Sequence, residues 1–93
     1  MRTCKVVHLR KASYDKYIGR PSILGNPFEI GKDGTRKEVI RKFKEYAVER
    51  LKSDRMFRKA ILDCEGKTIA CWCKPQDCHG DVFNYLISKA KKI

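Results

Sequence analysis

The sequence predicts an α/β fold, a small Rossmann-like sheet of about three strands packed with about three helices. Short β-branched or apolar runs at residues 5–10 and 67–72 are typical of strands. Residues 36–52 instead repeat apolar side chains at helical spacing. Strands and helices that alternate over only 93 residues predict one layered domain that spans residues 1–93.

The first strand is expected at residues 5–10, where Val6, Val7 and Leu9 favour extended backbone. His8 lies inside this run, and a lone histidine in a strand is more often structural than catalytic. A second strand is expected at residues 14–18. It ends at Gly19, where a long loop begins.

Residues 19–35 predict a loop of defined shape, since they contain four of the six glycines and two of the three prolines. Four apolar side chains indicate that this loop is ordered: Ile23, Leu24, Phe28 and Ile30. Arg20, Ser22 and Asn26 offer cationic and neutral donors to a ligand. In the alternative interpretation, Arg20 pairs with a nearby carboxylate and Asn26 caps a turn.

A helix is expected to begin after Thr35, because Thr35 and Glu38 match a capping box. Its predicted apolar stripe consists of Val39, Ile40, Phe43, Ala47 and Leu51. The basic side chains of its exposed face include Arg36, Lys37, Arg41 and Lys44. Three further elements are expected after this helix. The first is a shorter helix, capped by Ser53 or Asp54 and closing near Gly66. A strand at 67–72 and a helix at about 81–90 follow it.

The charge balance favours anionic partners. Lys and Arg total 22 against 11 Asp and Glu, which gives a formal net charge of +11 and steers nucleic acids, nucleotides and acidic proteins toward the chain. Much of this charge could equally be a solvated surface.

No apolar run is long enough to span a membrane, so we expect a cytoplasmic protein, and its five cysteines are expected to stay reduced. The glycine-rich segment at residues 31–34 lacks the residue spacing of a Walker-type phosphate-binding loop. A nucleoside triphosphatase of the Walker type is therefore excluded.

Residues 71–81 contain an unusual set of chemically active side chains. They hold three of the five cysteines, one of the two histidines and the only tryptophan. A strand-like segment precedes them and a helix-like segment follows, which predicts a strand-to-helix turn. Such a turn presents backbone N–H groups and the positive end of a helix dipole, which suit an anion or an activated thiol.

Three interpretations of this turn stay open. Zinc is the first, because a Cys₃His set is present: Cys71, Cys73, Cys78 and His79. The spacing counts against zinc, since paired cysteines in structural sites are usually two to four residues apart. In the second, Cys78 is a nucleophile with His79 as general base, and Asp81 caps the helix or orients His79. In the third, the cysteines are small core residues and Gly80 lets the backbone approach the sheet.

Three segments together resemble a known family. Residues 19–28 read GRPSILGNPF, residues 31–36 read GKDGTR, and the last segment runs from Cys71-Trp72-Cys73 to Cys78-His79-Gly80-Asp81. Their combination resembles the bacterial and phage family called domain of unknown function 4326, from about Val6 to Ile87. The resemblance implies a compact α/β domain with a site built from the loop and the cysteine-histidine turn. The matching motif positions are Arg20, Ser22, Gly25, Asn26, Pro27, Asp33, Gly34, Cys71, Cys73, Cys78, His79, Gly80 and Asp81.

We expect the loop from Arg20 to Asn26 and the turn from Cys78 to Asp81 to meet at the carboxyl end of the sheet, where open α/β folds bind ligands. The leading hypothesis is a pocket for a phosphate-bearing small molecule such as a nucleotide. Its expected ligand-binding residues are Arg20, Ser22, Gly25, Asn26, Asp33 and Gly80, and any chemistry would involve Cys78, His79 and Asp81. Replacing Arg20 and His79 is expected to abolish binding and to leave the thermal midpoint nearly unchanged.

Two other classes remain as alternatives. One is a basic module that binds nucleic acid through Arg36, Lys37, Arg41 and Lys44, with or without a zinc ion at the cysteine turn. The other is a phage protein that binds a host protein. Whether the chain catalyses a reaction stays open at this stage.

Overall fold

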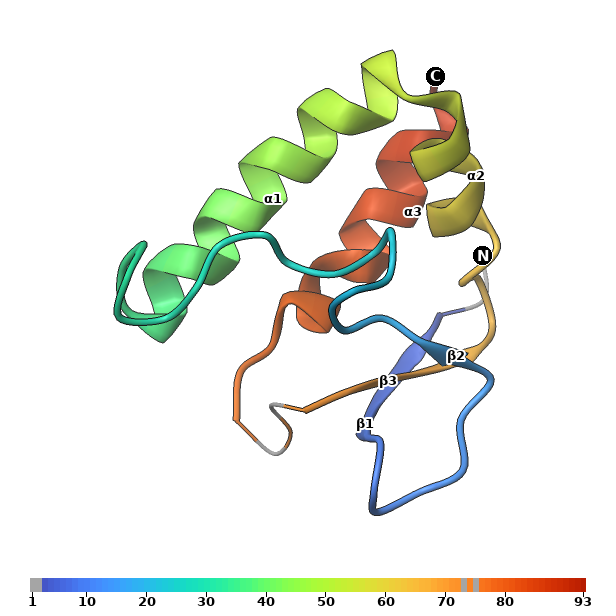
Figure 1. The fold of residues 1–93 in the computed structure, drawn as a ribbon. Coiled ribbons are helices and arrows are strands. Elements are labelled where there is room, and N and C mark those ends of the chain that lie inside the picture. The colour runs from blue at the N-terminus through green and yellow to red at the C-terminus, as the bar shows by residue number, and fades with distance from the viewer. Residues whose placement is uncertain (1–2, 73, 75) are drawn as a thin grey trace.

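A computed structural model describes residues 3–72, 74 and 76–93, and three short strands form its parallel sheet (Figure 1). These are β1 (Lys5–His8), β2 (Lys16–Tyr17) and β3 (Thr68–Cys71). The order across the sheet is β1-β3-β2, so the last strand in the sequence lies between the first two. Lys5 of β1 pairs with Thr68, and Lys16 of β2 pairs with Ile69.

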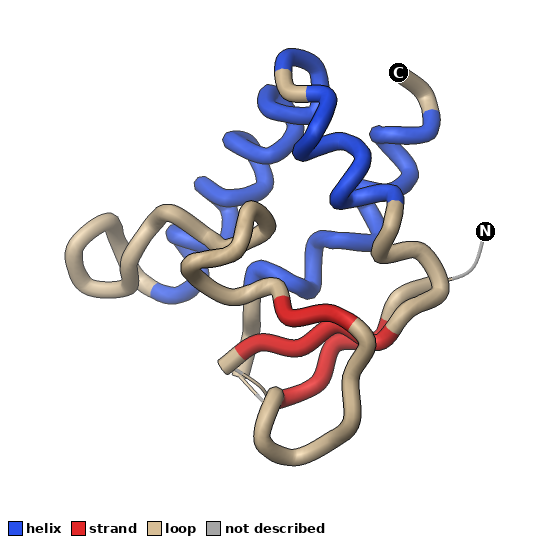
Figure 2. The backbone as a smooth tube through the Cα atoms, turned by 45° about the vertical axis from the view of Figure 1, so that its right-hand side comes forward, coloured by secondary structure: helices blue, strands red, loops and turns tan. Residues whose placement is uncertain are grey.

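The connections between the strands differ in kind. A loop over residues 9–15 joins β1 to β2, whereas α1 (Arg36–Ser53) and α2 (Arg55–Leu62) lie between β2 and β3. A 3₁₀ turn, η1 (His79–Val82), then leads into α3 (Phe83–Lys91). Figures 1 and 2 show the three helices on one side of the sheet. The predicted α/β class, with three strands and three helices, is confirmed. The fold has two layers, one formed by the sheet and the other by the helices.

The first two helices, α1 and α2, begin at capping residues that the sequence indicates. The Thr35 hydroxyl accepts a hydrogen bond from the Glu38 N–H, and the Glu38 carboxylate accepts one from the Thr35 N–H, so two otherwise unpaired donors of α1 are satisfied. Asp54 caps α2, because its carboxylate accepts the Phe57 N–H at 3.1 Å. Arg50 holds the same carboxylate at 2.9 Å. One aspartate therefore sets the angle at which α2 leaves α1.

The core lies between the sheet and the helices. Phe43, Ala47 and Leu51 of α1 are fully buried there, as the apolar stripe predicts, while Ile40 of the same predicted stripe is only partly buried. Phe57 and Ile61 of α2, Ile69 of β3, and Phe83, Leu86 and Ile87 of α3 complete the cluster. No helix in the part of the chain that the structure describes has the length and apolar character needed to cross a membrane.

Several element boundaries differ from the sequence-based expectations. The second strand is short, Lys16–Tyr17, and Asp15 just before it binds Thr68 twice: its N–H donates to the Thr68 carbonyl at 2.8 Å, and its carboxylate accepts the Thr68 N–H at 2.8 Å. β3 ends at Cys71 and does not reach Trp72. The second helix ends at Leu62, and the third is preceded by a 3₁₀ turn. Each difference lies at an end, where local side-chain contacts compete with regular backbone pairing.

Candidate functional site

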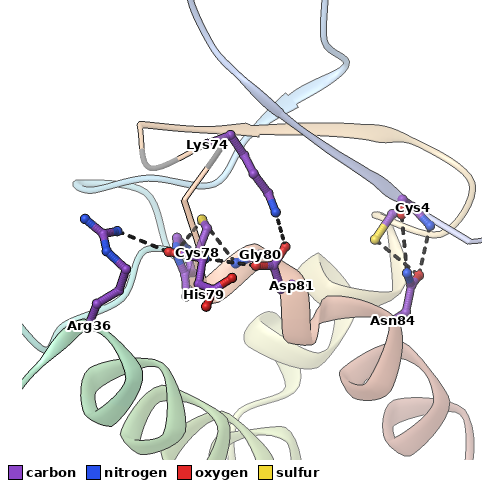
Figure 3. A network of polar contacts seen from close by, with 9 residues as sticks. Cys4, Arg36, Lys74, Cys78, His79, Gly80, Asp81 and Asn84 are labelled. Carbon is purple, nitrogen blue, oxygen red and sulfur yellow. Dashed lines mark hydrogen bonds and ion pairs between the residues drawn. The ribbon is translucent and has the colours of Figure 1, made fainter.

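The turn after β3 is organised by Cys78, which caps η1. The Cys78 sulfur accepts a hydrogen bond from the Gly80 N–H at 3.4 Å, and the Asp81 carboxylate accepts one from the Cys78 N–H at 2.9 Å. The other Asp81 oxygen binds Lys74, as Figure 3 shows. Asp81 therefore acts in the structure as a helix cap, one of the two roles that the sequence suggests, and the chain's own groups occupy these N–H donors.

His79 joins this turn to the long loop. Its Nε2 lies 2.9 Å from the Ile18 carbonyl oxygen and 3.1 Å from the Leu24 carbonyl oxygen. Because carbonyl oxygens only accept, Nε2 must carry the proton, and Nδ1 is then the unprotonated nitrogen of the neutral ring. Phe43 and Phe83 pack edge-on against the ring at centroid distances of 4.9 Å and 5.8 Å. His79 is thus fixed in one tautomer by the backbone and not by Asp81.

The thiol of Cys78 lies beside the basic nitrogen of His79. Its sulfur is 3.6 Å from Nδ1, so the S–H group can donate toward the ring. Burial lowers the pKa of His79, against the opposing effect of the hydrogen bonds to the Ile18 and Leu24 carbonyls, and this favours the neutral ring. Transfer of the thiol proton to Nδ1 would leave a negatively charged Cys78 thiolate beside the Gly80 N–H. The same burial opposes the imidazolium that this transfer forms.

The long loop places its polar side chains in two different settings. Arg20 is exposed and pairs with Glu29 at 3.2 Å. Asn26 donates to the Val39 carbonyl at 3.3 Å and accepts the Phe28 N–H at 3.0 Å, so its amide shapes the loop against α1. Both contacts correspond to the alternative interpretation, a carboxylate pair and a capped turn.

A cavity of about 400 Å³ opens where the loop, the start of α1 and the residues after β3 meet. Its position, next to the carboxyl ends of β2 and β3, is the one expected for open α/β sheets. The predicted site residues that line it are Arg20, Asn26, Arg36, Cys71, Cys78 and His79. The remaining lining residues are Gly19, Phe28, Glu29, Ile30, Val39, Ile40, Trp72 and Asp77.

Of the residues predicted to bind the ligand or to take part in chemistry, five do not line this cavity: Ser22, Gly25, Asp33, Gly80 and Asp81. The Asp33 carboxylate accepts the Glu29 N–H at 2.8 Å within a turn. The Ser22 hydroxyl is buried and finds no hydrogen-bond partner among the described residues. A Cβ atom at Gly80 would lie 2.8 Å from the Ile18 side chain and 3.0 Å from that of Val6, so this glycine lets the turn pack on the sheet.

The basic residues at the start of α1 are partly engaged within the chain. Arg36 donates to the Asp77 carbonyl oxygen at 3.1 Å, as Figure 3 shows. Arg41 lies 4.0 Å from Glu45, and the Lys44 ammonium lies 4.2 Å from the centre of the Tyr85 ring. Lys37 is exposed. This face therefore mixes charges and is not a uniform cationic strip.

The proposed zinc ligands are described only in part. Cys71, Cys78 and His79 lie around the cavity, whereas Cys73 lies outside the described residues. Among the described residues, no group of three His, Cys, Asp or Glu side chains is arranged to hold a metal ion. Nε2 of His79 is directed at two carbonyl oxygens, so only Nδ1 could act as a ligand.

Trp72, Glu29 and Asp77 also line the cavity, although none of them is among the predicted site residues. Trp72 could have been found, because it is the only tryptophan and stands at the end of the predicted third strand, on the carboxyl side of the sheet. Glu29 and Asp77 carried no pattern of their own. Their place at the cavity depends on how the long loop and the cysteine-histidine turn fold back, which local sequence does not reveal.

Comparisons with known proteins agree with the resemblance seen in the sequence. Residues 3–89 match the model of the family described as domain of unknown function (DUF4326). A protein of Enterobacteria phage T4, described as an uncharacterized 12.4 kDa protein in the nrdA-td intergenic region, is 34% identical over 92 residues, which cover 98% of this chain and 83% of the phage protein. No solved structure matches the chain. The chain therefore belongs to the DUF4326 family.

Proposed function

We propose that the chain binds a phosphate-bearing small molecule of mononucleotide size in the cavity at the carboxyl end of the sheet. The observation that carries this proposal is that residues from two segments far apart in the sequence line one cavity together with the start of α1: one segment is 19–30, and the other contributes residues 71, 72 and 77–79. Its volume of about 400 Å³ is within the range of small-molecule sites. Apolar and charged side chains share the lining, as ligand sites commonly require.

In this proposal, Arg20 and Arg36 of the cavity lining bind the phosphate. Arg20 is held by an exposed ion pair with Glu29, and such pairs contribute only about 0–1 kcal/mol, so a doubly charged phosphate can compete for the guanidinium. Arg36 extends from the first turn of α1 and donates one N–H to the Asp77 carbonyl oxygen. Each guanidinium has five N–H donors, which leaves several for a bidentate contact with a phosphate.

The acidic lining residues restrict the type of ligand. Glu29 and Asp77 line the cavity beside the two arginines, so the site would disfavour an anion that carries only phosphate groups. Carboxylates accept hydrogen bonds from hydroxyl groups. A ligand with both a phosphate and a sugar satisfies both kinds of residue, and the net charge of +11 steers it toward the protein.

The test uses Arg20→Gln and Arg36→Gln, with Lys37→Gln as the matched control. Lys37 is an exposed cation next to Arg36 that does not line the cavity. Titration calorimetry with AMP, GMP, CMP and UMP should show each arginine variant binding at least about tenfold more weakly, the usual effect of losing a charged hydrogen bond. Lys37→Gln should bind like the wild type. Unchanged dissociation constants in both arginine variants would remove the proposal.

His79 is not a suitable substitution for this test. The sequence-based expectation was that replacing His79 would leave the thermal midpoint nearly unchanged. The contacts of His79 predict the opposite, because its side chain has 7% exposure and binds two backbone carbonyls. Loss of binding in a His79 variant would therefore report unfolding as well as lost contacts.

The basic composition supports nucleic-acid binding as a second candidate. The net charge of +11 on 93 residues favours any polyanion, and Arg36, Lys37, Arg41 and Lys44 all belong to α1, with Arg36 also in the cavity lining. A salt series separates the two candidates. If four basic side chains contact phosphates of a DNA duplex, the logarithm of the association constant should fall with the logarithm of the salt concentration with a slope of about −3.6. A small ligand with one bound phosphate predicts a much shallower slope. A shallow slope with DNA and RNA would reject the second candidate.

A further inference from the structure

Trp72 is an exposed aromatic side chain held in a fixed position. It is the only tryptophan of the chain, and 51% of it is exposed, whereas Phe43, Phe57 and Phe83 are fully buried. Its indole N–H donates to the Tyr17 hydroxyl at 2.9 Å. Tyr17 in turn donates to the Arg20 carbonyl oxygen at 2.9 Å. These two hydrogen bonds join Trp72 to the start of the long loop and fix the orientation of the ring.

Two further side chains support the same ring. The Arg10 guanidinium lies 4.9 Å from the centre of the indole, within cation–π distance, and His8 packs edge-on at 5.9 Å. Trp72 borders the cavity, while Arg10 and His8 lie outside its lining. Because 51% of Trp72 is exposed, aromatic surface remains available to a ligand despite these two contacts.

The rest of the lining extends this surface toward the groups that would bind phosphate. Phe28, Ile30, Val39 and Ile40 supply apolar contacts in the same cavity, and Arg20 belongs both to the lining and to the hydrogen-bond chain from Trp72. A flat aromatic group beside Trp72 and a phosphate at Arg20 can then belong to one ligand. A sugar phosphate or inorganic phosphate would leave the indole unused.

We propose that Trp72 is the base-stacking residue of the cavity and that the ligand is a nucleoside phosphate whose base lies against the indole. This inference rests on the proposed function, because it assigns the aromatic part of the same ligand. Stacking on an aromatic side chain tolerates any base, since every base has a π face. The site therefore discriminates nucleotides from sugar phosphates more strongly than it discriminates one base from another.

The experiment compares ligands with and without a base on Trp72→Leu and Trp72→Phe. Trp72→Phe keeps an aromatic face but lacks the indole N–H, so it separates stacking from the hydrogen bond to Tyr17. AMP, GMP, CMP and UMP serve as nucleotides and ribose 5-phosphate as the ligand without a base. Calorimetry measures affinity, and the single tryptophan reports stacking directly through its own fluorescence.

We expect nucleotides to quench the Trp72 fluorescence saturably and ribose 5-phosphate to leave it unchanged. Trp72→Leu should weaken nucleotide binding by about 5- to 150-fold, the range for losing one stacked base, and Trp72→Phe by less. Ribose 5-phosphate should bind all three proteins equally weakly. If nucleotides bind Trp72→Leu as tightly as the wild type, the stacking assignment fails and the pocket proposal stands. If none of the four nucleotides binds the wild type, both fail.

Discussion

His79→Ala should destabilise the fold strongly, although sequence patterns place this histidine among candidate catalytic residues. The side chain has 7% exposure and donates from Nε2 to the carbonyl oxygens of Ile18 and Leu24, which are themselves buried. Removing the ring leaves both acceptors without this donor. It also removes the edge-on contacts with Phe43 and Phe83.

The expected loss follows from these contacts. An unsatisfied buried acceptor costs about 1–3 kcal/mol, and we take the lower value for each carbonyl because water can enter from the adjacent cavity. Lost aromatic packing adds about 1 kcal/mol. The free energy of unfolding should thus fall by about 3 kcal/mol, a large part of the 5–15 kcal/mol typical of a domain. For a chain of 93 residues this lowers Tm by about 15 °C.

Thermal and urea unfolding, followed by circular dichroism, measure this loss. His79→Gln keeps an N–H donor at a similar reach and should recover about half of the lost stability. His8→Ala is the matched control, because His8 lies partly exposed on β1, where its ring accepts the nearby Arg10 N–H at 3.1 Å and packs edge-on against Trp72. A loss of less than about 1 kcal/mol in His79→Ala, or an equal loss in His8→Ala, would show that the imidazole does not hold the two carbonyls in solution.

Three other predictions concern pH, capping and thiol reactivity. Burial lowers the pKa of His79, so below about pH 6.5 the unfolded chain binds a proton that the folded chain does not, and stability should decline as the pH falls from 7 toward the folded-state pKa. Urea unfolding between pH 7.5 and 5 should show this decline in the wild type and much less of it in His79→Gln; parallel curves would contradict it. Thr35→Ala should cost about 1 kcal/mol in thermal unfolding and Thr35→Ser little, and equal losses would show that the hydroxyl does not cap α1. Burial raises the pKa of Cys64 to about 11, so mass spectrometry should find this thiol unmodified by iodoacetamide at pH 8 until urea unfolds the chain, and rapid modification of the folded chain would refute its burial.

Local interactions explain most of what the sequence predicts correctly. Thr35 with Glu38 acts over three residues, so their spacing is enough to place the start of α1, and the same kind of local signal narrows the cap of α2 to Ser53 or Asp54, of which the structure uses Asp54. The apolar stripe of α1 is likewise visible in the sequence as a 3.6-residue period. These features need no knowledge of the rest of the fold.

Contacts between distant residues explain what the sequence does not reveal. His79 meets the Ile18 and Leu24 carbonyls across 61 and 55 residues, and no local pattern indicates an imidazole bound to backbone. The same holds for Arg36, whose contact with the Asp77 carbonyl brings the start of α1 to the rim of the cavity across 41 residues. The sequence thus identified polar candidates in the two segments, but their actual partners depend on the tertiary fold.

The position of β3 has a consequence for the order in which the protein assembles during synthesis. β1 and β2 do not pair with each other, and each finds its hydrogen-bonding partner only in β3, which begins at Thr68. A nascent chain that has reached only residue 66 can form the first two helices, since their caps and hydrogen bonds are local, but it has no third strand to complete a sheet. The ribosome must therefore add the residues of β3, Thr68–Cys71, before β1 and β2 gain a stable place in a sheet.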